Sequence, residues 1–477
     1  QAIVHRPQWV ILAVAVVSLF FAWHVPKLSI RTSIYDLVIE DLPETARYNE
    51  FKEVFGSDEI IRVVVKAENV FDPATFNKIG QLAETASEIE GVRRVISLPG
   101  IKKDVETGST WSLDKFATMV TPVAVFNKNL ISEDHKATVM TLVLEDTSDR
   151  TTVIQDVDKM IEEADKNLSL YQIGMPLVSE ALANFTKKDF FHLPPITFLI
   201  IAVLLFFLFR NIACLLLPLT CVTLALVWTF GLMALTKTPL SMMTMIVPVF
   251  LIAVGTAYCL HIGSEYLSYS QTAESRAEAS FLTFSTISFP TVLAVVTTAI
   301  GLGSLLVNRI VAIREFALFS CFGMFSLMII VLTLFPAALA LFPLPKKKAD
   351  DATETPTIID RFLGWIVHLD LHKQKITLPI LGIFVAFCII GIFRIRVETS
   401  PVEFFKKDTA VSRHFHDIYK DLSGSFPVNV VMASPDDDYF EDPDNLAEIA
   451  ELQEFLETLP RVDKAVSFAE YLKLVSY

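Results

Sequence analysis

Seven apolar runs, each long enough to cross a bilayer, constrain this sequence more than any other feature. A membrane-spanning helix needs about 20 predominantly apolar residues, because it rises about 1.5 Å per residue through a hydrocarbon layer about 30 Å thick. No small-residue cleavage site follows the first run, so it is expected to be a retained span rather than a signal peptide. The sequence therefore predicts a polytopic α-helical membrane protein. The runs lie at residues 9–25, 193–209, 212–235, 240–262, 281–307, 313–342 and 376–393.

Two polar segments, residues 27–191 and 395–477, hold most of the acidic side chains. The net charge of −14 argues against nucleic-acid binding, which requires a basic face. Lys and Arg concentrate in alternate short loops, such as those holding Arg210 and Lys346–Lys348. This bias predicts that these loops and the N-terminus are cytoplasmic, and that both polar segments lie outside the membrane on the opposite side.

The five cysteines all fall in apolar runs. No disulfide framework or metal-binding spacing is therefore expected, and a bacterial protein is favoured over an animal one. The sequence also contains no recognisable nucleophile triad, phosphate loop or zinc spacing. We expect no enzyme activity, no cofactor and no metal site.

An internal repeat relates the two polar segments. Asp72-Pro73 and Asp442-Pro443 each open an amphipathic stretch, and a β-like stretch ending at Ser97 or Ser467 follows each. The two offsets agree, since 442 − 72 = 370 and 467 − 97 = 370. The pattern predicts a parallel repeat of one span, one polar domain and five spans. The second copy stops at Tyr477, so the chain is expected to be a fragment. The upstream pairs at nearly the same offset are Thr32-Ser33 and Thr399-Ser400.

The first polar segment predicts two β-α-β units. The first unit has strands at 60–65 and 92–98 around a helix from about Pro73, and the second has strands at 137–144 and 168–173 around a helix at 149–167. This order favours ferredoxin-like α+β subdomains. The expected domains are a first span (1–26), a periplasmic porter-like domain (27–191), a five-helix bundle (192–342), a cytoplasmic linker with an amphipathic helix (343–375), a seventh span (376–394) and the start of a second periplasmic domain (395–477).

The plan of one span, a large polar domain and five further spans, repeated once, resembles the resistance-nodulation-division superfamily. Local stretches agree with this resemblance: they are Ile173–Val178, Gly255–His261, Thr297–Gly303, and Arg314–Phe316 followed by Gly323. The first polar segment is too short for the added docking subdomain of the multidrug trimers. The chain is more similar to the branch with the hopanoid exporters and the mycobacterial large membrane proteins (MMPL), and its bundle to the sterol-sensing region of Patched-like proteins.

The fourth apolar run holds the candidate residues for ion coupling. Proton-driven family members usually place an aspartate before a tyrosine there, whereas this chain has Ala257 before Tyr258. His261 is three residues from Tyr258 and four from Glu265, which predicts one helical stripe. A histidine can carry a proton near neutral pH, so the stripe is a candidate relay, or an ion site that includes Thr256. The alternative is a histidine hydrogen-bonded at the membrane edge, with Glu265 in the headgroup zone.

Small residues in the spans are candidates for close helix packing or gating. They are Gly255 and Ala257 in the fourth run, and Gly301 and Gly303 in the fifth.

Together these features predict a secondary transporter that exports lipids or other hydrophobic molecules from a bacterial inner membrane, driven by a gradient of protons or another cation. Expected partners are membrane lipids, a lipid-like substrate and, as one option, further copies of the chain. The missing fourth-span acid leaves open a non-transporting sensor or scaffold. A subunit of a tripartite drug-efflux pump is the other alternative.

Overall fold

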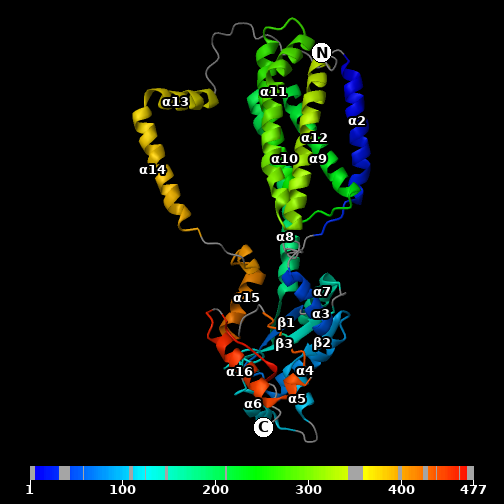
Figure 1. Cartoon of the computed structure of the whole chain (residues 1–477), viewed down its shortest axis with the longest axis vertical. Helices are drawn as coiled ribbons and strands as arrows, with labels where there is room; N and C mark the ends of the chain where they lie inside the picture. The colour runs from blue at the N-terminus through cyan, green and yellow to red at the C-terminus, as the bar shows by residue number, and fades with distance from the viewer. Residues whose placement is uncertain are drawn as a thin grey trace.

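The structure is a computed structural model with a helical bundle at one end and a mixed α/β part at the other (Figure 1). Both polar segments lie at the same end of the bundle. The repeat residues Thr32-Ser33 and Thr399, Arg210, and the linker stretch 342–357 lie outside the described residues. The structure describes residues 6–31, 43–56, 59–106, 111–123, 125–145, 149–209, 212–341, 358–395, 400–422, 428–436, 438–460 and 462–469.

Among the described residues, seven helices are long and apolar enough to cross a membrane, which confirms the seven predicted spans. Six of them form the bundle, and α12 is its most buried member. Aliphatic and aromatic side chains of α9, α10 and α12 fill its core, together with residues from α2 and α11. The bundle helices are α2 (Pro7–His24), α8 (Met175–Phe209), α9 (Ile212–Leu235), α10 (Val247–Ser270), α11 (Arg276–Gly303) and α12 (Val311–Leu341).

The first span is packed into this bundle. The buried Trp228 indole of α9 donates a hydrogen bond of 2.9 Å to the Ser18 hydroxyl of α2. A Cβ on Gly231 would lie 2.6 Å from the Cβ of Phe21, so glycine permits α2 and α9 to cross this closely. The contact integrates the N-terminal helix with the rest of the bundle.

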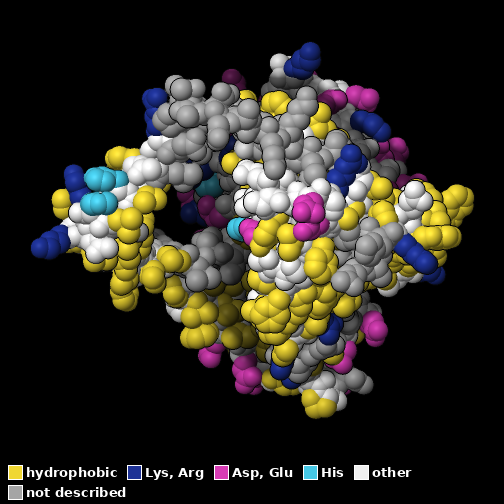
Figure 2. All heavy atoms as spheres, turned by 90° about the horizontal axis from the view of Figure 1, so that it is seen from above, with side chains coloured by type: hydrophobic (Ala, Val, Ile, Leu, Met, Phe, Trp, Pro, Cys, Tyr) yellow, Lys and Arg dark blue, Asp and Glu magenta, His cyan; other side chains and the backbone are white. Residues whose placement is uncertain are grey.

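The seventh span stands apart. Helix α13 (Ile358–His372) lies across the end of α14 (Gln374–Ile392), and no described residue of α14 is buried. From above, open space separates this arm from the bundle, whose sides carry mostly hydrophobic side chains (Figure 2). Exposed apolar side chains on α13 include Phe362, Trp365 and Ile366, in keeping with the amphipathic helix expected there.

The strands of the two predicted β-α-β units interleave in one four-stranded antiparallel sheet. Its order is β2-β3-β1-β4, and the β-α-β-β-α-β connectivity is ferredoxin-like. In register, Val63 of β1 faces Met140 of β3 and Gln172 of β4. The elements are α3 (Pro43–Phe55), β1 (Ile60–Lys66), α4 (Pro73–Ser87), β2 (Val92–Ile96), α5 (Leu98–Val105), α6 (Leu113–Val120), β3 (Ala137–Leu144), α7 (Arg150–Glu163) and β4 (Ser169–Ile173).

Different helices pack on the two faces of the sheet. Ile61 and Val63 face the helices α4 and α7 of the same domain. Val64 faces the other way, where it packs with Phe415 and Ile418 of α15 (Ala410–Asp421), a helix of the second polar segment. The side chains of one strand alternate between faces, so both segments share this sheet.

The end of β4 leads directly into α8, one of the candidate membrane spans. Gly174 has φ of +154°, and a Cβ there would lie 2.5 Å from the Ile60 carbonyl oxygen, so the turn requires glycine. Helix α8 begins at Met175 and runs without a break to Phe209. One continuous helix, with Pro194 and Pro195 in its interior, therefore joins the sheet to the bundle.

The two repeat helices begin alike. Asp72 caps α4 by accepting from the Ala74 amide, and Asp442 caps α16 (Pro443–Glu457) by accepting from the Asp444 amide. Each helix has proline at its first position and 15 residues. The stretch from Val462 to Ser467 differs from β2, because it pairs with no strand among the described residues.

Candidate functional site

In α10, Tyr258, His261 and Glu265 follow one side of the helix, whereas Thr256 lies on another side. His261 and Ala257 are exposed, Tyr258 and Glu265 are half-buried, and Thr256 is buried. The Thr256 hydroxyl donates to the Ile252 carbonyl at 2.7 Å, so its own helix satisfies it. No hydrogen bond or ion pair within the described part of the chain joins His261 to Tyr258 or Glu265. The relay therefore stays a prediction, and its members are not assembled here.

The exposed side of α10 is a continuous face. It carries small side chains around His261, at spacings of three and four residues that bring them onto one side of the helix. Within the described residues, the bundle leaves this face uncovered. The exposed face of α10 consists of Ala253, Ala257, His261, Ser264 and Ser268.

The four candidate packing residues behave differently. A Cβ on Gly255 would lie 2.8 Å from Val222 Cγ2 and 2.9 Å from Leu327 Cδ2, so α9 and α12 pack closely against this glycine. A Cβ on Gly301 or Gly303 would meet nothing within 4 Å. Ala257 lies on the exposed face of α10. Close packing is thus observed at Gly255, while for the other three it is not seen between described residues.

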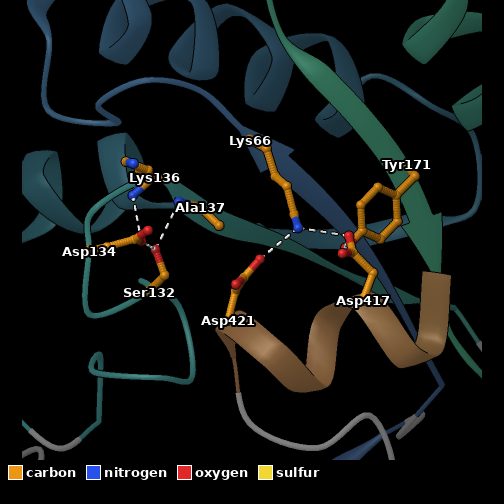
Figure 3. Close-up of polar contacts among 8 residues, drawn as sticks. All are labelled: Lys66, Ser132, Asp134, Lys136, Ala137, Tyr171, Asp417 and Asp421. Atoms are coloured by element: carbon orange, nitrogen blue, oxygen red, sulfur yellow. Dashed lines mark hydrogen bonds and ion pairs between the residues drawn. The ribbon is translucent and has the colours of Figure 1, made fainter. Parts of the chain in front are cut away.

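A polar cluster fastens α15 to the sheet (Figure 3). The Lys66 ammonium of β1 lies 2.7 Å from Asp417 Oδ2 and 2.6 Å from Asp421 Oδ2. The Tyr171 hydroxyl of β4 donates to Asp417 Oδ2 at 2.9 Å, and the His414 ring stacks on Tyr171 with 4.4 Å between centroids. We call these five residues the α15 clamp. It holds the second polar segment against the first domain.

The surroundings of Asp417 in the α15 clamp favour its ionised carboxylate. Burial alone would raise the pKa of Asp417, but hydrogen bonds from Lys66 and Tyr171 lower it by more. Burial would lower the pKa of Lys66, and the two carboxylates raise it above its ordinary value. Burial, together with the Arg413 charge, lowers the pKa of His414, so the folded state favours a neutral imidazole.

A cavity of about 860 Å³ opens between the first domain and the second polar segment. This volume lies in the range of small-molecule sites. The wall from the first domain includes Phe51 and Phe55 of α3, Arg62 of β1, and Asn129. The second segment supplies mostly apolar side chains, among them Val428, Val430, Met432, Ile449, Leu452, Leu456 and Val466.

Arg62 places a cation in this apolar wall. Its side chain is half-buried, and the guanidinium Nη2 donates to Asn129 Oδ1 at 3.4 Å. Asn129 is itself held by a hydrogen bond from Nδ2 to the Val125 carbonyl. Arg62, Val64 and Lys66 alternate along β1, so the cavity and the α15 clamp occupy the same face of the sheet. In the described ranges, no group of three or more His, Cys, Asp or Glu is placed to hold a metal ion.

Comparison with known proteins decides the family. The model of the MMPL family matches residues 44–359, more than half of the chain. The chain belongs to the MMPL family. This confirms the resemblance to the MMPL-like branch of resistance-nodulation-division proteins. A membrane protein of Methanocaldococcus jannaschii is 20% identical to this MMPL chain over 355 residues, covering 70% of the chain and 91% of that relative. The apo-petrobactin exporter of Bacillus anthracis is 30% identical over 173 residues, covering 34% of this chain but only 23% of that exporter.

Sequence reasoning did not single out the α15 clamp or Arg62 in this MMPL chain. A signal was available: strand 60–66 carries two cations, Arg62 and Lys66, on one face of an otherwise apolar strand. In the second segment, His414, Asp417 and Asp421 recur at helical spacing beside apolar residues. No pattern in the sequence indicated that Lys66 and Asp421, which are 355 positions apart, would lie in contact.

Proposed function

We propose that this MMPL chain is part of a secondary transporter that exports lipids or other hydrophobic molecules. The observation that carries the proposal is the apolar cavity between the two polar segments, beside the sheet that α8 connects to the bundle. A hydrophobic molecule leaving the membrane requires an apolar site beyond it, because water does not solvate its hydrocarbon part. The name of the Bacillus anthracis relative, an exporter, supports this direction of movement.

Ion-gradient coupling through α10 is the second part of the proposal. The His261 side chain is exposed within a helix long and apolar enough to span the membrane. Ionisable groups are costly at such depth and are retained mainly for function. A gradient-driven change at α10 would reach the cavity through the bundle and α8, because α8 continues without a break to the turn after β4.

Transport can be tested directly. The protein, reconstituted in proteoliposomes, would be given a fluorescent lipid analogue with and without an imposed proton gradient, in parallel with His261→Ala. The matched control is Ser264→Ala, a substitution on the same exposed face. Gradient-driven movement that His261→Ala abolishes and Ser264→Ala preserves supports coupling at α10. Movement retained in His261→Ala would assign coupling to another site.

A non-transporting sensor is the second candidate function. It is favoured by Ala257, which stands where proton-driven relatives of this superfamily place an aspartate. A sensor would bind the lipid analogue with no net movement under any gradient. The same proteoliposome experiment therefore separates the two functions.

A further inference from the structure

A pair of histidines lies on the surface of α13, outside both the cavity and the α15 clamp. His368 and His372 are four residues apart in this helix, and both side chains are exposed. Their rings stack with 4.6 Å between centroids and 20° between planes, so the two imidazoles lie side by side. Figure 2 shows histidine side chains together on this arm, with Lys and Arg side chains beside them.

The spacing of the pair suits a chelated metal ion. Residues four apart on a helix lie one above the other, which is how two histidines of one helix bind zinc in metalloproteases. A zinc–nitrogen bond is about 2.0–2.1 Å long, so the two donor nitrogens must come within about 4 Å of each other. Rings whose centroids are 4.6 Å apart reach this separation through small rotations of the side chains.

The donor atoms of the pair select the class of metal. Imidazole nitrogen binds zinc, copper and nickel, whereas magnesium and calcium require oxygen ligands. In the described ranges no third His, Cys, Asp or Glu is placed to join the pair, so water would fill the remaining positions. Such an open site differs from the closed zinc sites of four protein ligands, whose spacing the sequence lacks.

Two neighbouring cations act against metal binding, to a small extent. Lys373 follows His372 directly, Lys375 lies in the first turn of α14, and both side chains are exposed. Because the two ammonium groups are in water, salt screens their repulsion of a bound metal ion. We therefore expect zinc to bind somewhat more tightly at high ionic strength than at low ionic strength.

We propose that His368 and His372 form a binding site for a divalent transition-metal ion of the zinc and copper class. Each ring coordinates the ion through one nitrogen, and the chelate links two successive turns at the end of α13. Only Lys373 separates α13 from α14, so the bound ion stabilises the helix that directly precedes this candidate span. The site is independent of the export function proposed above, because neither the cavity nor α10 takes part in it.

Zinc titration tests the site. The whole protein in detergent, without a histidine tag, would be titrated with Zn²⁺ in competition with a chromophoric zinc chelator. We expect the tightest zinc site to weaken at least about tenfold in His368→Gln and in His372→Gln, because the second, intramolecular ligand is lost. The matched control is His192→Gln, which removes an exposed histidine of α8 and should bind zinc as the wild type does. Equal zinc affinity in His368→Gln and the wild type would overturn the proposal.

A register variant separates chelation from the number of histidines. His368→Gln combined with Leu371→His keeps that number but places the two histidines on adjacent residues, about 100° apart around the helix. Leu371 is 62% exposed, so little packing is lost. We expect this variant to bind zinc as weakly as His368→Gln alone. Wild-type affinity in it would mean that zinc binding does not depend on the geometry of the pair, and the proposal would fail.

Copper reports the ligands directly. Electron spin-echo modulation of one equivalent of bound Cu²⁺ counts the coordinated imidazoles, and we expect two in the wild type and one in His372→Gln. Mg²⁺ and Ca²⁺ in large excess should leave zinc binding unchanged, because they require oxygen ligands. A single imidazole in the wild type, or displacement of zinc by Ca²⁺, would exclude the two-histidine site.

Discussion

Lys66 and Asp421 are 355 positions apart in the sequence, yet the Lys66 ammonium lies 2.6 Å from Asp421 Oδ2. The same ammonium lies 2.7 Å from Asp417 Oδ2, so one cation on β1 fixes two turns of α15. This contact ties the second polar segment to the sheet of the first. The apolar cavity lies between the same two segments.

Removing the cation should loosen α15. In Lys66→Met the apolar stem is kept, but two partly exposed carboxylates lose the cation between them, at a cost of about 1–2 kcal/mol. We expect amide hydrogen exchange in residues 410–421 to quicken about tenfold, while α4 is unchanged. The control is Lys159→Met, which removes a solvent-exposed ion pair with Asp156 on α7. Unchanged exchange in α15 of Lys66→Met would show that its apolar contacts alone hold the helix.

The α15 clamp should also weaken in mild acid. The pKa of His414 is lowered in the folded state, so the unfolded chain takes up a proton first as the pH falls below the ordinary value of 6.5. Stability is thus fully present above pH 6.5 and is lost progressively below it. Asp417, whose pKa is lowered from 3.8, contributes only at more acidic pH.

Hydrogen exchange of α15 at pH 7 and pH 5, corrected for intrinsic rates, measures this loss. We expect protection to fall by a few-fold in the wild type and to stay nearly constant in His414→Gln. A similar fall in both proteins would assign the pH dependence to another group. Tyr171 stacks on the His414 ring, and the charged side chains that act on its pKa are Arg413 and Asp417.

Much of the fold followed from local sequence pattern. The seven spans were predicted because a run of about 20 apolar residues has few stable alternatives to a membrane helix. The strands near Ile60 and Ala137 were predicted from β-branched runs, and the caps Asp72 and Asp442 fixed the starts of two helices. These features depend on neighbours within about 20 residues.

What the sequence could not predict depends on distant neighbours. Tyr258 and His261 lie on the same helix, but how far each is buried depends on how α9 and α12 pack against α10. No local sequence pattern predicts that packing. The α15 clamp and the cavity likewise depend on how two segments meet. The predictions for the Gly301 and Gly303 contacts also assumed a neighbouring helix, and none of the described helices lies within contact distance of an added Cβ.

Helix packing at Gly255 can be tested against Gly301. In Gly255→Ala the new methyl would lie 2.8 Å from Val222 Cγ2, so the side chains must move, at a cost of about 1–3 kcal/mol. Gly301→Ala meets no neighbour and should be neutral or slightly stabilising, because alanine favours helix by about 1 kcal/mol. Thermal unfolding of the purified protein in detergent measures both. A loss of stability in Gly301→Ala equal to that in Gly255→Ala would contradict this packing.

The Trp228–Ser18 hydrogen bond should hold the first span in place. In Ser18→Ala the buried indole N–H loses the only acceptor that the structure shows for it, at a cost of about 1–3 kcal/mol. Trp228→Phe removes the donor together with part of the packing, so it is also destabilising. The double variant should cost less than the sum of the two, because neither partner then remains unsatisfied. Thermal unfolding of the wild type and the three variants completes the cycle. Strictly additive effects would show that the two side chains stabilise α2 independently, through packing rather than through their hydrogen bond.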